Sequence, residues 1–123
     1  MATVFVLQEV MRKSAVIDGV TIMSPTIDFS NAIEYGDLVV CLPAGRVSLS
    51  PGPTIDTLKE KLRNFSDDDY LLPVGNPGLI AVAGAIAAEN NMGRFKVLIW
   101  DKEVRRYIKV DYDLNYRRNR KEN

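Results

Sequence analysis

Apolar and polar positions follow two different periods along the chain, and each change of period marks the boundary between a strand and a helix. Residues 3–10 (TVFVLQEV) are rich in β-branched and aromatic side chains and predict a strand. Residues 37–43 (DLVVCLP) form a continuous apolar run between Gly36 and Pro43, which is typical of a strand covered on both faces. Residues 70–74 predict a further, shorter strand.

Two segments have the period of helices. In residues 55–65 (IDTLKEKLRNF) the apolar side chains recur every three or four positions, so they lie on one face of a surface helix, and Thr54 is placed to cap it. A second helix is expected to begin at Pro77, with Asn76 as its cap, and to end before Gly93. Residues 79–88 carry no charge, so we expect this helix to be largely buried.

The remaining segments complete a mixed sheet. Residues 94–100 and 105–114 are strand-like, and their short connection predicts an antiparallel hairpin. Between residues 11 and 36 we expect a small hairpin around Asp18-Gly19 and then an irregular connection. From residue 37 to residue 100 the order is strand, helix, strand, helix, strand, which requires parallel neighbouring strands. The sequence therefore predicts a small three-layer α/β domain, whose mixed sheet has a parallel βαβαβ core and a C-terminal antiparallel hairpin.

Length and composition narrow the function. We expect residues 1–116 to form one domain and residues 117–123 to form a basic flexible tail. The formal net charge of the whole chain is nevertheless zero. The chain has no histidine and one cysteine, which excludes His-based acid–base catalysis, a Cys–His nucleophile pair and the usual zinc sites within the isolated chain. Cys41 lies in an apolar run and is interpreted as a buried filler. No secretory signal or membrane span is visible, so the cytoplasm is the expected location.

Ligands of open parallel sheets bind outside the carboxyl ends of the strands, which here are residues 43–53, 75–78 and 100–103. Backbone N–H groups at the start of the second helix could hold an anion there. The candidate ligand-binding or anion-binding residues are Arg46, Ser48, Ser50, Gly75, Asn76, Gly78 and Asp101. The alternative is an ordinary strand-to-helix turn, because GNPG lacks the spacing of dinucleotide and phosphate loops and Pro77 has no N–H.

A second group of candidates could contact a partner protein or nucleic acid. These are the basic and aromatic residues of the last strand and of the tail, Arg105, Arg106, Tyr107, Arg117, Arg118, Arg120 and Lys121. The alternatives are a charged edge strand that needs no ligand and a solvated terminus. Residues 67–69 (DDD) are interpreted as a solvated turn rather than a cation site, because three consecutive residues rarely converge on one ion. No metal site and no cofactor are expected.

Two strings, YLLPVGNP and VLIWDKEVRRYI, resemble a family of small uncharacterised proteins encoded by tailed bacteriophages and prophages. The likeness extends back through VVCLPAGRVSLSPGP and covers about two thirds of the chain, without the first 36 residues or the tail. It implies a phage origin, and it supplies no catalytic residue to carry over.

Three functions remain open at this point. A phage origin favours a small non-enzymatic protein that binds a host or phage macromolecule in host takeover, counter-defence or DNA metabolism. The second is a domain that binds a nucleotide or anion at the three loops. The third is a minor structural or assembly protein. A host or phage protein is the most expected partner, nucleic acid could bind the tail, no membrane is expected, and self-association is left open.

Overall fold

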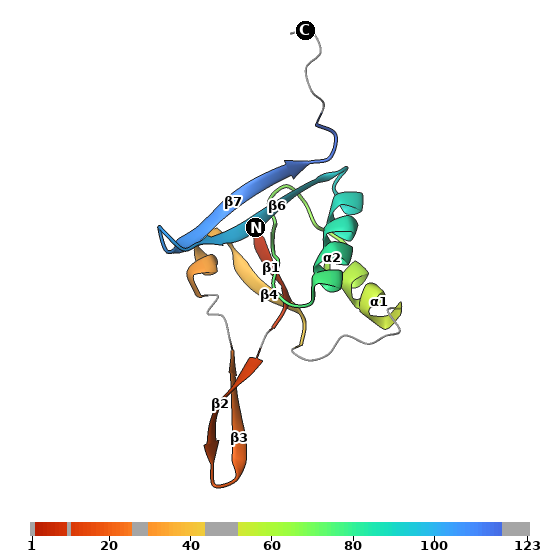
Figure 1. Ribbon diagram of the computed structural model, residues 1–123. Coiled ribbons are helices and arrows are strands. Elements are labelled where there is room, and N and C mark those ends of the chain that lie inside the picture. The colour runs from red at the N-terminus through yellow and green to blue at the C-terminus, as the bar shows by residue number, and fades with distance from the viewer. Residues whose placement is uncertain (1, 10, 26–29, 44–51, 117–123) are drawn as a thin grey trace.

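Five strands form one mixed sheet in the order β4-β1-β5-β6-β7 (Figure 1). The computed structural model describes residues 2–9, 11–25, 30–43 and 52–116. Within these residues the elements are β1 (Thr3–Gln8), β2 (Met11–Ile17), β3 (Val20–Pro25), the 3-10 helix η1 (Ser30–Tyr35), β4 (Asp37–Leu42), α1 (Gly52–Lys61), β5 (Tyr70–Leu72), α2 (Pro77–Asn90), β6 (Arg94–Asp101) and β7 (Arg106–Asp113). The pairs β4–β1, β1–β5 and β5–β6 are parallel and β6–β7 is antiparallel, so the predicted α/β fold with a mixed sheet is confirmed.

The strand β1 is inside the sheet, where it lies between β4 and β5. The prediction that the strands from residue 37 onward are direct neighbours is therefore wrong for β4 and β5. One row of side chains crosses the four parallel strands, Val39, Phe5, Leu71 and Val97. A strand that is buried from Val4 to Gln8 gains most when it has a neighbour on each side, and this favours an interior position for β1.

The two faces of the sheet are covered unequally. Both α-helices pack on one face, where Phe5, Leu58, Leu62 and Ile86 belong to one core cluster (Figure 1). On the other face Val6, Leu72, Leu98 and Tyr107 form a second cluster with Ala32 of η1. In the part of the chain that the structure describes, the three layers are thus a pair of α-helices, the sheet, and a short 3-10 helix.

The helix α2 begins at Pro77 as predicted. The Asn76 side-chain oxygen Oδ1 accepts hydrogen bonds from the N–H groups of Gly78 (2.8 Å) and Leu79 (3.3 Å). The prediction that α2 is largely buried is wrong for its outer face, because Ala81 and Ala85 are exposed. An alanine side chain presents so little apolar area that an uncharged helix face of this kind does not require a cover.

Three local features depart from the sequence interpretation. The helix α1 begins at Gly52, ahead of the expected cap Thr54. Residues 30–35, expected to be irregular, form η1. Asp69 is buried, and its carboxylate accepts hydrogen bonds from the N–H groups of Thr3 (3.1 Å) and Ser66 (2.9 Å), which join the start of β1 to the turn before β5. The expected solvated turn therefore holds at Asp68 and is wrong at Asp69.

Candidate binding surface

A buried glutamine connects the loops at the carboxyl ends of the parallel strands. Gln8 ends β1 and is 6% exposed. Its Nε2 donates to the carbonyl oxygen of Pro43, after β4 (3.3 Å), and its Oε1 accepts from the N–H of Asn76, after β5 (3.0 Å). Gln8 was not among the predicted site residues, although a polar residue that ends an otherwise apolar strand is a signal for such a role.

The candidate anion-binding residues of the described loops serve the turns in which they lie. Gly78 donates its N–H to the cap Asn76, and the N–H of Asn76 is bound to Gln8, so these donors already have acceptors. Asp101 Oδ1 accepts from the N–H groups of Glu103 (2.8 Å) and Val104 (3.2 Å) and closes the β6–β7 turn. Arg46, Ser48 and Ser50 lie outside the described residues. Anion binding at this end of the sheet stays a prediction.

Gly75 has a specific reason to be glycine. Its φ is +113°, and a Cβ at this position would stand 2.5 Å from both Cβ and Oε1 of Gln8. The turn and the glutamine are therefore packed together without room for a side chain, and the Gln8 amide reaches Asn76 only because residue 75 has no Cβ.

The basic and aromatic candidates divide into exposed and buried residues. Arg105 and Arg106 are exposed at the start of β7. Tyr107 is 3% exposed, its ring lies edge-on to Trp100 with the centroids 5.1 Å apart, and its carbonyl oxygen accepts a 2.7 Å hydrogen bond from the Tyr35 hydroxyl. Tyr107 thus anchors η1 to the sheet. Arg117, Arg118, Arg120 and Lys121 lie outside the described residues.

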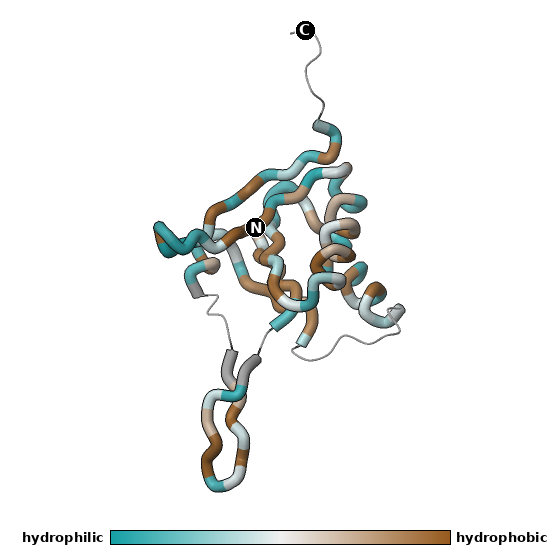
Figure 2. Tube along the Cα trace, viewed as in Figure 1, coloured by the Kyte–Doolittle hydropathy of each residue, from teal (hydrophilic) through white to brown (hydrophobic). Residues whose placement is uncertain are grey.

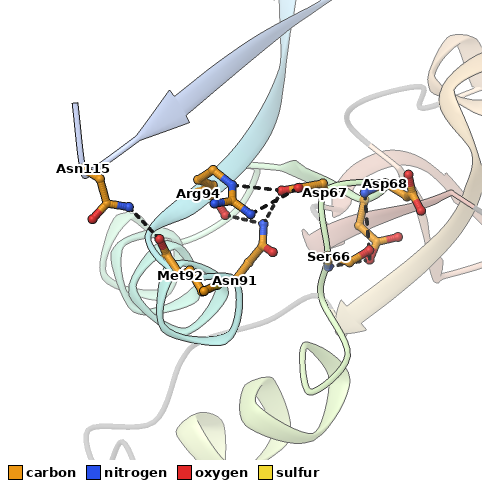
Figure 3. Close-up of polar contacts among 8 residues, drawn as sticks. Ser66, Asp67, Asp68, Asn91, Met92, Arg94 and Asn115 are labelled. Atoms are coloured by element: carbon orange, nitrogen blue, oxygen red, sulfur yellow. Dashed lines mark hydrogen bonds and ion pairs between the residues drawn. The ribbon is translucent and has the colours of Figure 1, made fainter.

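A charged cluster lies at the opposite end of β6, where no site was predicted (Figure 3). The Asp67 carboxylate accepts from Asn91 Nδ2 (2.8 Å) and from Nε and Nη2 of Arg94 (both 3.3 Å). The hydrogen bond from Asn91 has the largest effect and those from Arg94 the next, and together they lower the pKa of Asp67. A shallow hollow of about 330 Å³ lies beside this cluster, and Lys96 and Asp111 also line it. Asp113 lines it as well, so three acidic side chains stand beside two basic ones in the lining.

The hairpin formed by β2 and β3, which we call the arm, projects from the sheet (Figure 1). Its turn is Asp18-Gly19, as predicted, and both residues have positive φ, 50° and 77°. Figure 2 shows hydrophobic stretches on both strands of the arm. Residues 13–23, whose side chains are described, are all exposed.

The cross-strand register sorts these side chains onto two different faces. Ala15 pairs with Ile22 and Ile17 pairs with Val20, and these two pairs share one face because the intervening pair, Val16 and Thr21, points the other way. We call the side chains of Ala15, Ile17, Val20 and Ile22 the arm face. Ile17 and Val20 are each 59% exposed and Ile22 is 38% exposed. An entirely apolar surface of this kind, held away from the core, is a feature of interaction sites.

The described residues contain no group of three or more His, Cys, Asp or Glu side chains arranged to hold a metal ion. Cys41 is buried, and burial raises its pKa to about 11, so its thiol is not an activated nucleophile. Among the described residues no helix is long and apolar enough to span a membrane.

Fold and surfaces together define a small α/β sheet domain that carries a projecting β-hairpin. The chain belongs to the Phage Pam3 gp32-like protein family, whose model matches residues 2–114. It is therefore a phage protein, and the match includes residues 2–36, which lie in the segment that the resemblance had left out. Searches of curated proteins and of solved structures find no match.

Proposed function

We propose that this phage protein acts without catalysis, by binding a host or phage protein during infection, and that the arm face makes the contact. The observation that supports this function is the exposure of Ile17, Val20 and Ile22 on one side of a hairpin that stands clear of both core clusters. A two-stranded hairpin is marginally stable by itself in water, and a surface laid against its apolar face would stabilise it.

The energy available at the arm face is enough for a specific contact. Full burial of a Val or Ile side chain contributes about 1.5–3 kcal/mol. The three large side chains of the arm face are each about half exposed, so burying what remains exposed contributes about 3 kcal/mol in total. This corresponds to a change of more than a hundredfold in affinity. The arm face would thus supply the central apolar contact of an interface, while the surrounding polar groups supply orientation.

The chemistry of the arm face favours protein over nucleic acid as the partner. Nucleic acid binding depends on Lys and Arg near phosphates, and the four residues of the arm face carry no charge. Nucleotide or anion binding at the strand ends has weaker support, because Asn76 and Gln8 already accept the hydrogen bonds of the N–H groups there. The role in host takeover, counter-defence, DNA metabolism or assembly depends on the identity of the partner.

Two neighbouring arm residues of similar exposure provide a matched test. Ile17 (59% exposed) belongs to the arm face, and Val16 (56% exposed) points the opposite way. Ile17→Lys and Val16→Lys add the same charge one residue apart, so the two variants differ in the face they alter. Circular dichroism and thermal unfolding should show that both variants fold like the wild type.

The binding experiment uses the full chain as bait in lysate of the host bacterium taken during phage growth, followed by titration of each captured protein in purified form. We expect the authentic partner to lose at least tenfold in affinity for Ile17→Lys and to bind Val16→Lys nearly as well as the wild type. The role of the arm face would be contradicted if every captured protein bound the two variants with equal affinity. It would also be contradicted if every captured protein lost the same affinity for both variants.

A further inference from the structure

The second outer strand of the sheet, β7, has β6 as its only strand neighbour among the described residues (Figure 1). It spans Arg106–Asp113, eight residues, which is long for an edge strand. A long edge presents a row of backbone hydrogen-bonding groups to solvent, and proteins usually cover such an edge or pair it.

The ladder with β6 shows which residues point outward. The N–H of Leu114 donates to the carbonyl oxygen of Gly93, on the β6 side (2.8 Å). In an antiparallel ladder the backbone groups of alternate residues point toward the same neighbour, so Tyr112, Val110 and Ile108 also bond toward β6. The backbone groups of Lys109 and Asp111 therefore point to the outer edge. The hydrogen bond from Tyr35 to the Tyr107 carbonyl agrees with this alternation, because Tyr35 does not belong to β6.

We propose that the β7 edge pairs with the β7 edge of a second copy of this chain, antiparallel and around a two-fold axis at Val110. Identical edges of two sheets can join into one continuous sheet only in the antiparallel sense, and the result is a closed, self-complementary dimer. The choice of a second copy rests on the order of charges along β7.

Basic residues occupy the first half of β7 and acidic residues the second half. With Val110 on the axis, Lys109 lies opposite Asp111 of the second copy, and Asp111 lies opposite Lys109 of the second copy. These two are the outward-bonding residues, so they would form the hydrogen-bonded pairs of the new ladder. Opposite charges at directly opposed positions of an antiparallel pair are stabilising.

The register is selective because the neighbouring registers bring like charges together. A shift must move the strands by two residues to keep each side chain on its own face of the sheet. One such shift places Lys109 opposite Lys109, and the other places Asp111 opposite Asp111, and like charges directly opposite are destabilising. The charges on this edge thus block slipped pairing while they permit one register.

The helix face of the same strand is also self-complementary. Ile108 (38% exposed) would lie opposite Tyr112 (44% exposed) of the second copy, and Val110 would lie opposite Val110. Tyr112 is held in place by Phe95, with the ring centroids 5.5 Å apart. Aromatic and β-branched cross-strand pairs stabilise sheets, so the apolar row adds to the charge pairs on the opposite face.

Sedimentation velocity over a concentration series tests the proposal on the full-length protein. We expect the wild type to change from monomer to dimer as its concentration rises, and Lys109→Asp or Asp111→Lys alone to weaken the dimer at least tenfold, because each variant opposes like charges twice. Lys59→Asp on α1, also exposed, is the control for a charge change and should dimerise like the wild type.

Mixing the two weakened variants tests the register itself. A chain with Lys109→Asp and a chain with Asp111→Lys carry opposite charges at both opposed positions, so an equimolar mixture should recover dimer to within a few fold of the wild type. The double variant Lys109→Asp/Asp111→Lys should recover it as well. A wild type that stays monomeric, a dimer that neither single reversal weakens, or a mixture that does not recover would overturn the proposal.

Discussion

The turn at Gly75 allows the clearest prediction about stability. An alanine there would have to adopt φ near +113°, and its Cβ would meet Gln8 at 2.5 Å. Gln8 is 6% exposed and bound to both Pro43 and Asn76, so it has no free space in which to move aside. Gly75→Ala should therefore strain the turn and break the hydrogen bond between Gln8 and Asn76.

The expected magnitude follows from these two effects. A side chain held in a sparsely populated backbone region costs about 1–3 kcal/mol. A buried amide that loses its partner costs about 1–3 kcal/mol more. Their sum, about 4 kcal/mol, is a large part of the 5–15 kcal/mol that is typical of a domain of this size. The midpoint of urea unfolding should fall by about 2 M at an ordinary m-value.

Gly84 provides the matched control. It lies inside α2, and nothing stands within 4 Å of the position that a Cβ would take. Gly84→Ala should stabilise the protein by about 0.5–1 kcal/mol, because alanine is the better helix former and meets no obstacle. The clash between a residue-75 side chain and Gln8 is refuted if the free energy of unfolding of Gly75→Ala lies within about 1 kcal/mol of the wild-type value. It is also refuted if both alanine variants shift the urea midpoint alike.

Three further predictions use the same protein. Asn76→Ala removes the α2 cap and should lower the free energy of unfolding by about 1 kcal/mol, measured by urea titration; an unchanged value would contradict the capping role. Burial raises the pKa of Cys41 from 9.0 to about 11, so the folded state holds the thiol proton more tightly. The contribution of Cys41 to stability should be intact below pH 9 and decline by about 2–3 kcal/mol as the pH rises to 11, and Cys41→Ala should lack this component. Because Asn91 is the main cause of the lowered pKa of Asp67, Asn91→Ala should move that pKa toward its ordinary value of 3.8 in a carboxyl NMR titration, and an unmoved pKa would contradict this.

Local signals predicted much of the fold. Asn76-Pro77 marks the start of α2 because an amide cap and a residue without an N–H both suit a helix N-terminus. Asp18-Gly19 marks the turn of the arm because both positions require positive φ. The strands β6 and β7 are strongly patterned and close in the chain, so their antiparallel pairing was visible in the sequence.

Contacts between residues far apart in the chain account for what the sequence did not predict. Phe5 pairs with both Val39 and Leu71, and no local period encodes that β1 enters between β4 and β5. Gln8 joins two loops that are distant in sequence, so its role emerges only when β1, β4 and β5 are side by side. The arm face was not predicted because a short apolar hairpin has the same sequence pattern whether it is buried or projects into solvent.

The arm and the β7 edge belong to different sheets, and this makes their functions separable. The arm lies between β1 and η1 in the chain and forms a two-stranded sheet of its own, whereas β7 forms one edge of the five-stranded sheet. Ile17→Lys should therefore leave dimer formation unchanged, and Lys109→Asp should leave the affinity of a single arm unchanged. A dimer presents two arms, so a partner with repeated sites, immobilised at high density, should release the wild type more slowly than the Lys109→Asp variant, because both arms must detach together. Equal release rates on such a surface, from a wild type shown to be dimeric, would mean that the two arms do not bind at the same time.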